Sequence, residues 1–320
     1  MAPKNYLDFE KPIIQLYEKI EELKELSNAD NLDMTSDIEN LKNKAEKLKQ
    51  KIYENLEPIQ VVKLSRHPER PITSDYIANV FEDFVELHGD RVFADDHAMI
   101  GGFAKFEGKP VMIIGQQRGK TTKEKIYRNF AMPQPEGYRK ALRLMRLAEK
   151  FDIPIVTLID TQGAYPGLGS EERGVAEAIA MNLREMMGIT VPIISIVIGE
   201  GGSGGALGIA IGNTVAMLNY SIYSVISPEG CAAILWRDAG MAPTAAHNLG
   251  IVSAKLKELG IVDAIIEEPL EGAHTNHKKV FTKFRSFLKK ELTKYEKYSD
   301  EKLLEQRYNR FRALGKIKEA

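Results

Sequence analysis

The sequence has little cysteine, little histidine and no long apolar run, and each shortage excludes a class of protein. The single thiol, Cys231, can form neither an internal disulfide nor a cysteine-based zinc site, and six histidines alone give weak support for a metal. No apolar run reaches the roughly 18 residues that a transmembrane helix needs. The first 25 residues carry several acidic side chains, which a signal peptide lacks. We therefore expect a soluble, reduced, cytoplasmic protein with no metal and no membrane association.

An excess of charge of one sign is also missing. The 44 Lys and Arg nearly balance the 45 Asp and Glu, which argues against nucleic-acid binding as the main role. Apolar residues make up 43% and charged residues 28%, so a substantial core is possible and a disordered chain is excluded. A length of 320 residues suits one large domain or two modest ones.

Glycine is absent from residues 9–56, a segment rich in Lys and Glu. On either side of a polar break at residues 27–31, apolar residues recur at spacings of three and four: Ile13, Leu16, Ile20 and Leu23, then Ile38, Leu41, Ala45, Leu48 and Ile52. This spacing predicts an apolar seam on each of two helices, joined by a short polar turn into an antiparallel hairpin. We expect a solvated packing arm here rather than a catalytic unit.

From about residue 100, short apolar runs bounded by Gly or Pro alternate with segments of helical spacing. The runs are 111–114, 155–159, 193–198, 214–218, 224–226 and 260–266, and the helical segments are 136–150, 171–187, 229–237 and 242–259. Continuous apolar runs are typical of strands that are covered on both faces. The alternation predicts an α/β layer architecture, and we find no internal repeat.

The chain becomes basic near its end. Residues 274–320 hold 14 Lys plus Arg against 6 Asp plus Glu, a difference of +8. One side of a predicted helix is apolar, at Val280, Phe284, Phe287 and Leu288. The basic residues are therefore better explained as the solvent-exposed face of a packed helix than as a surface for a partner.

The glycine-rich segment 199–208 follows a predicted strand and opens a helix. Glycines allow close backbone approach, and a helix N-terminus offers free N–H donors, so the segment is suited to stabilising negative charge. Gly199-x-Gly201-x-x-Gly204 also fits the dinucleotide fingerprint. The next strand begins too soon, near Thr214, and no acidic residue follows about 20 residues on, which argues against that interpretation.

A second alternative is a hydrolase. Gly201-x-Ser203-x-Gly205 fits a nucleophile elbow, and Asp263 and His274 follow in the order that a triad requires. However, no upstream His-Gly-Gly segment is present to complete an oxyanion hole, and a serine among glycines also suits an anion-binding loop. The hydrolase interpretation is less favoured but stays open at this point.

A basic tract lies at residues 115–128. Its start resembles a phosphate-binding loop but has three residues between Gly115 and Gly119 where four are required, so we reject that interpretation. Residues 118–128 carry five positive side chains against the single acid Glu124. This tract could form a groove for phosphates or an anionic partner, or only a solvated loop. With the basic tail, it is the only support for a third class, a scaffold or nucleic-acid-binding module.

A second glycine loop, residues 160–167, follows the strand predicted at 155–159. Gly163 and Gly167 permit backbone conformations that other residues avoid, and Pro166 stiffens the turn. Two such loops at the ends of successive parallel strands would face the same edge of the sheet. Ligands bind at that edge in folds of this class.

Several long motifs, in one order, resemble the α subunits of the bacterial acetyl-CoA carboxylase carboxyltransferase family. They lie at 86–91, 115–119, 135–145, 160–167, 199–208 and 224–230. The resemblance runs from the helical arm to about residue 275. It implies an α/β fold of the crotonase/ClpP type, a superhelix of β-β-α units with an N-terminal helical hairpin. The implied divisions are an arm at 1–57, a carboxyltransferase domain at 58–275 and a basic helical tail at 276–320.

The resemblance also implies a function. Family members transfer the carboxyl group of carboxybiotin, held on a biotin carboxyl carrier protein, to acetyl-CoA, giving malonyl-CoA in the first committed step of fatty acid synthesis. The implied partners are a β subunit with a zinc ribbon, in an α2β2 assembly, the carrier protein and a biotin carboxylase. The lone cysteine agrees that this chain is not the zinc-ribbon subunit.

In the family picture no side-chain base is required, and fixed N–H donors stabilise the negative charge that develops on the biotin oxygen. The resemblance assigns that oxyanion hole to the backbone N–H groups of Gly205 and Ala206, with Gly204 shaping the approach. The predicted walls of the carboxybiotin pocket are Gly163, Ala164, Tyr165, Gly201, Gly202 and Ser203. Arg118 and Lys120 are candidates for attracting the phosphates of CoA or the acidic carrier, and His88 and His274 are expected to be structural.

Overall fold

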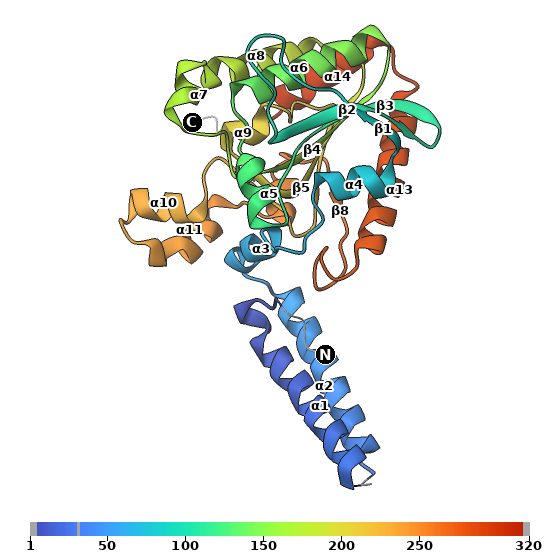
Figure 1. Ribbon diagram of the computed structural model, residues 1–320, viewed down its shortest axis with the longest axis vertical. Coiled ribbons are helices and arrows are strands. Elements are labelled where there is room, and N and C mark those ends of the chain that lie inside the picture. Colours follow the sequence, from blue (N-terminus) through green and yellow to red (C-terminus); the bar gives the residue numbers. More distant parts are fainter. Residues whose placement is uncertain (1–4, 31–32, 316–320) are drawn as a thin grey trace, which may run out of the picture.

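The computed structural model describes residues 5–30 and 33–315, and its N-terminal part is a helical hairpin. Helix α1 (Lys11–Asp30) and helix α2 (Thr35–Glu54) lie side by side and project away from the rest of the chain (Figure 1). Ile13, Ile20 and Ala45 of the predicted seams are buried, which confirms the hairpin. Residues 1–4 of the predicted arm, Asn31 of its turn and residues 316–320 of the predicted tail lie outside the described residues.

The remainder of the described residues is built on one mixed sheet of eight strands. They are β1 (Glu82–Glu86), β2 (Met99–Phe106), β3 (Lys109–Gln116), β4 (Ile155–Thr161), β5 (Ile193–Gly202), β6 (Thr214–Leu218), β7 (Ile222–Ser224) and β8 (Ala264–Ile266). The strand order is β1-β2-β3-β4-β5-β6-β8, and β7 pairs with the end of β5. The pairs β1–β2 and β2–β3 are antiparallel, and every pair from β3 onward is parallel.

Helices cover both faces of this sheet, as the continuous apolar runs predict. Along β5, Ile193 and Val197 join a core with α6 (Pro135–Lys150) and α8 (Val175–Gly188). Ile194 and Ile196 point to the other face, where they join a core with α4 (Thr73–Val80) and α13 (His277–Tyr295). The two sets lie on opposite faces because successive side chains of a strand point alternately to the two faces of the sheet.

Glycines divide two segments that sequence analysis treats as continuous helices. The segment 171–187 is interrupted at Gly174, whose φ of 78° starts α8 after α7 (Leu168–Glu172). The segment 242–259 is interrupted at Gly250, with φ 63°, between α11 (Ala242–Leu249) and α12 (Ser253–Glu258). Positive φ is incompatible with a continuing right-handed helix, so the single-helix predictions are wrong there.

Other boundaries also differ from the predictions. The run 224–226 contributes only its first residue to β7, and only the last three residues of 260–266 form β8. Helix α10 (Pro228–Leu235) confirms the helical segment predicted at 229–237. The apolar pattern does not predict the remaining helices, which are α3 (Pro58–Ser65), α5 (Thr122–Tyr127), α9 (Ser203–Leu207) and α14 (Asp300–Arg312), with short 3-10 turns at Asp8–Glu10, Asn129–Ala131 and Ala239–Met241.

The basic C-terminal helices pack on the sheet. Val280, Phe284 and Leu288 of α13 are buried in the core, as their spacing predicts. Arg307 of α14 is fully buried and donates to backbone carbonyls that follow or end α8, including those of Ile189 (2.6 Å) and Val191 (3.0 Å). Burial lowers the pKa of Arg307 to about 10. Part of the basic charge therefore serves packing within the chain.

Candidate functional site

The two glycine loops meet at one edge of the sheet. Because β4 and β5 are adjacent and parallel, the segments that follow them leave the sheet on the same side. The contact is between backbones: a Cβ on Gly202 would lie 2.2 Å from the carbonyl oxygen of Gln162, and a Cβ on Gly205 would lie 2.4 Å from the carbonyl carbon of Gly163. Only glycine allows so close an approach, so these positions require it.

A cavity of about 710 Å³ opens where the loops meet. Its lining comes from α3, the β4 and β5 loops, α8, β7 and α10: Arg66, Arg118, Gln162, Gly163, Ala164, Ile179, Glu200, Gly201, Gly202, Ser203, Gly204, Gly205, Ile222, Ser224, Val225, Ile226, Ser227 and Glu229. The structure thus brings together most of the predicted pocket residues. Among the described residues, three that were predicted for the site do not line this cavity: Tyr165, Ala206 and Lys120.

These three residues lie nearby in other roles. Tyr165 donates its backbone N–H to the carbonyl of Pro133 (3.0 Å). Ala206 is buried directly behind Gly205 in α9. Lys120 forms an exposed ion pair with Asp75, whose nearest oxygen lies 2.6 Å from its Nζ.

The first turn of α9 supplies unused backbone donors at the cavity. Helix α9 begins at Ser203, so the N–H groups of its first turn have no acceptor within the helix. Within the described part of the chain, no hydrogen bond uses the N–H of Gly204 or of Gly205. Both residues line the cavity, so their donors are available to a ligand there.

A chain of ion pairs forms the polar side of the cavity. The Arg118 guanidinium lies 2.9 Å from Asp160 and 2.6 Å from Glu200. The other oxygen of Glu200 pairs with Arg66 (2.7 Å), which also reaches Glu229 (2.8 Å). The Glu200 N–H donates to Asp160 (3.0 Å), so the network ties the ends of β4 and β5 together.

The charges in this network are mutually compensated. Burial would raise the pKa of Glu200, but Arg118 and Arg66 outweigh burial and hold that pKa below its ordinary value. Burial raises the pKa of Asp160 against the opposing effect of Arg118. Arg118 and Lys120 are both paired with carboxylates, so these contacts do not support the prediction of free cations that attract phosphates.

Sequence reasoning missed Arg66 and Glu229 as pocket residues. Arg66 directly follows α3 and Glu229 lies in the first turn of α10, and neither belongs to a glycine loop. Glu200 lies inside the glycine motif and could have been recognised there as the one charged residue of the segment.

The triad of the hydrolase alternative is not assembled. Ser203 has the positive φ (51°) of a sharp strand-to-helix turn. However, the Asp263 carboxylate accepts hydrogen bonds from Arg310 (2.6 Å) and from a backbone N–H. The His274 ring stacks on His67, with ring centroids 3.7 Å apart, and does not line the cavity. The interpretation of Ser203 as a triad nucleophile is therefore wrong.

For the carboxyl transfer that the sequence resemblance implies, we expect Ser203→Ala to retain activity within about threefold of wild type, because removing a true nucleophile costs several orders of magnitude and the triad is not assembled around this hydroxyl. Steady-state rates of the variant and wild type, assayed side by side with the β subunit that the resemblance implies, measure the effect. A loss of more than about 100-fold would restore a chemical role for the hydroxyl.

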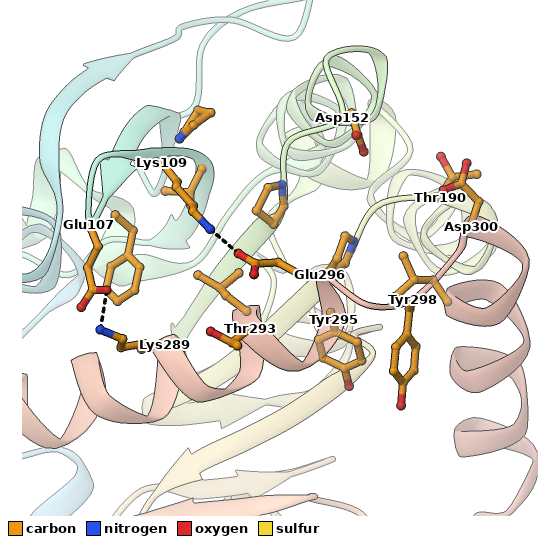
Figure 2. Close-up of a pocket in the computed structure, with 17 residues that line it drawn as sticks. Glu107, Lys109, Asp152, Thr190, Lys289, Thr293, Tyr295, Glu296, Tyr298 and Asp300 are labelled. Atoms are coloured by element: carbon orange, nitrogen blue, oxygen red, sulfur yellow. Dashed lines mark hydrogen bonds and ion pairs between the residues drawn. The ribbon is translucent and has the colours of Figure 1, made fainter.

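A second cavity, of about 540 Å³, lies at the opposite edge of the sheet. Its lining includes the first residues of β3 and the prolines just before β4 and β5, together with the last turns of α13. Two ion pairs cross it, Glu107 with Lys289 (2.9 Å) and Lys109 with Glu296 (2.6 Å), as Figure 2 shows. None of the predicted site residues lines it, and both of its lysines are paired with carboxylates.

The described residues contain no group of three or more His, Cys, Asp and Glu side chains that could hold a metal ion. Among the helices of residues 5–30 and 33–315, none combines the length and apolar character needed to cross a bilayer.

Comparison with solved structures shows the fold. The β subunit of P. aeruginosa geranyl-CoA carboxylase superposes with a TM-score of 0.55 at 17% identity, over 72% of this chain and 42% of that one. A Pseudomonas malonate decarboxylase hetero-dimer gives a TM-score of 0.55 at 14% identity, over 67% of this chain and 88% of that one. These neighbours are crotonase-like, which confirms the expected α/β fold class.

Comparison of sequences shows the family. The model of the family described as acetyl co-enzyme A carboxylase carboxyltransferase-like matches residues 6–315. The acetyl-coenzyme A carboxylase carboxyl transferase subunit alpha of Geobacter metallireducens is 53% identical over 319 residues, covering 100% of both chains. The protein of the same name from Vibrio vulnificus is 55% identical over 314 residues, covering 97% of this chain and 98% of that one. With its fold and its glycine-lined cleft, this chain belongs to the family of acetyl-CoA carboxylase carboxyltransferase α subunits.

Proposed function

We propose that this chain is one half of a carboxyltransferase that moves the carboxyl group of carboxybiotin to acetyl-CoA, giving malonyl-CoA for fatty acid synthesis. Its relatives are named as the alpha subunit of an acetyl-coenzyme A carboxylase carboxyl transferase, and they match this chain over nearly its whole length. The observation that carries the proposal is the cavity at the carboxyl ends of β4 and β5, where the N–H groups of Gly204 and Gly205 have no partner within the described residues.

These residues fit a biotin-like ligand. A ureido oxygen is neutral before reaction, and backbone N–H groups at a helix start recognise such an oxygen without a formal charge. The cation–carboxylate pairs nearby are already satisfied, so they do not compete for it. When bound, carboxybiotin supplies the carboxyl group and the oxygen on which negative charge develops.

The chain contributes fixed donors rather than an acid or a base. The N–H groups of Gly204, Gly205 and Ala206 point toward the start of α9, and we assign them to that oxygen. Gly163, Ala164, Gly201, Gly202 and Ser203 wall the cleft and exclude water. A preorganised donor contributes mainly when charge develops, and removing one costs about 100–1000-fold in rate.

We assign the acetyl-CoA side of the pocket and the delivery of the carboxyl group to partner proteins. The name of the relatives as α subunits implies a companion chain, and we propose a β subunit with a zinc ribbon that supplies the acetyl-CoA side of the pocket, in an α2β2 assembly. A biotin carboxyl carrier protein would deliver the carboxyl group, and a biotin carboxylase would load it. We propose a cytoplasmic location for this assembly.

Reconstitution tests the proposal. The purified chain alone should transfer no carboxyl group from a carboxylated biotin carrier to acetyl-CoA. Once it is mixed with a zinc-ribbon β subunit, the transfer should take place. Malonyl-CoA formation is measured directly. An active isolated chain, or an inactive mixture in which both subunits are folded and associated, would contradict it.

A further inference from the structure

A single buried side chain connects the two glycine loops. Gln116 is the last residue of β3 and is fully buried. Its Nε2 donates to the carbonyl of Gly205 (3.0 Å), and its Oε1 accepts the N–H of Asp160 (3.0 Å). One planar amide therefore fixes the end of β4 and the first turn of α9 at a defined separation.

Tyr138 is a second donor to the same carbonyl. Its hydroxyl lies 3.3 Å from the oxygen of Gly205, and its side chain is fully buried. The ring passes so close to Gly208 that a Cβ there would lie 2.6 Å from it. Asn182 donates to the carbonyls of both Tyr138 (3.0 Å) and Gly208 (2.9 Å), which fixes the backbone on which the ring is carried.

Helix α9 itself supplies no hydrogen bond to the carbonyl of Gly205 among the described residues. Helix α9 ends at Leu207, and among the described residues no backbone N–H donates to the oxygen of Gly205. The hydrogen bonds from Gln116 and Tyr138 are the ones that the described structure gives it. A buried carbonyl without donors is costly, so these side chains determine how this peptide unit is oriented.

We propose that Gln116 and Tyr138 are positioning residues for the oxyanion hole. A trans peptide unit is planar, with its C=O and N–H on opposite edges, so holding the Gly205 carbonyl fixes the direction of the Ala206 N–H. The same restraint fixes the first turn of α9, which carries the N–H groups of Gly204 and Gly205. This inference rests on the proposed function, since it assigns the geometry of that same site.

The chain offers a matched control in the next residue. Gln117 is also buried, and its amide accepts from the N–H of Ser74 and donates to the Ser74 hydroxyl and the Arg118 carbonyl. None of these contacts involves α9. Gln116→Leu and Gln117→Leu therefore remove equivalent buried amides, but only the first releases the Gly205 carbonyl.

The experiment compares both variants in the complex with the β subunit. We expect Gln116→Leu to lower kcat for carboxyl transfer about 10–100-fold with KM for acetyl-CoA within about twofold, because misplaced donors affect the developing charge and not acetyl-CoA binding. Gln117→Leu should lower the melting temperature to a similar extent and keep kcat within about twofold of wild type.

Tyr138→Phe keeps the test decisive if Gln116→Leu does not fold, because it removes one hydroxyl with almost no change of volume. We expect it to lower kcat about 3–10-fold at unchanged KM. Wild-type kcat in a folded Gln116→Leu or Tyr138→Phe complex, or an equal loss of kcat in Gln117→Leu, would overturn the positioning role alone. An inactive wild-type complex would instead overturn the proposed function, and this inference with it.

Discussion

Gly205→Ala is expected to lower carboxyl transfer by on the order of 100–1000-fold, the cost of losing an oxyanion donor. The added Cβ would lie 2.4 Å from the carbonyl carbon of Gly163 and 2.5 Å from the N of Ala164. Both are backbone atoms, which cannot turn aside as a side chain can. The two loops must therefore separate, and the N–H of Gly205 moves with them. The rate of malonyl-CoA formation by the complex measures the effect.

The neighbouring glycine provides the control for this prediction. A Cβ on Gly204 would meet only the Ile179 side chain, at 3.6 Å, which is an ordinary contact. Gly204→Ala should therefore leave the loops in place and keep the activity within about tenfold of wild type. Full activity in Gly205→Ala, with a melting temperature equal to that of Gly204→Ala, would show that the loop contact is dispensable.

The strands of the core and the edge that carries the site could be predicted from the sequence. Runs such as 155–159 and 193–198 are apolar at every position except Thr157 and Ser195, and such nearly continuous apolar runs are typical of strands covered on both faces. The glycine loops follow these strands directly, so the parallel arrangement places them together. Both features depend on residues close in the sequence.

Interactions between distant segments could not be predicted in this way. The basic tract around Arg118 suggests free cations, but Arg118 and Lys120 find their partners 42 or more residues away in the sequence, at Asp160, Glu200 and Asp75. Likewise, nothing local marks Arg66 as a pocket residue. Charge patterning shows where charge lies, but only the tertiary structure shows whether it is compensated.

The role of Gln116 shows the same limit within a recognised motif. Its neighbours identify the family, but an isolated glutamine in a strand carries no signal of its function. The function appears only when the ends of β3, β4 and β5 are placed side by side, because the amide then lies between two loops that are 44 and 89 residues further along. Catalysis by backbone groups depends on such supports, which sequence motifs do not display.

Arg118→Met is expected to destabilise the fold by roughly 3 kcal/mol at neutral pH, since removing one partner of a buried ion pair leaves its carboxylates uncompensated. Asp160 and Glu200 are almost fully buried, with 5% and 7% of their side chains exposed. Lys120→Met, in the same tract, is the control: its pair with Asp75 is exposed, so the loss should be below about 1 kcal/mol. Chemical denaturation of each variant measures both values.

The pH dependence of this loss of stability in Arg118→Met distinguishes an electrostatic role of Arg118 from a packing role. In wild type the pKa of Glu200 is held below its ordinary value of 4.5, so its contribution to stability is present above that pH and is lost as the pH falls through the lowered pKa. In wild type, Arg118 opposes the rise in the pKa values of Glu200 and Asp160 that burial causes. In Arg118→Met this opposition is lost, so both pKa values rise and the folded state binds protons more tightly than the unfolded chain. The difference in unfolding free energy between variant and wild type should therefore shrink as the pH is lowered from about 7 to about 5. A deficit that stays constant over this range would show that Arg118 stabilises the cleft by packing and not by compensating its carboxylates.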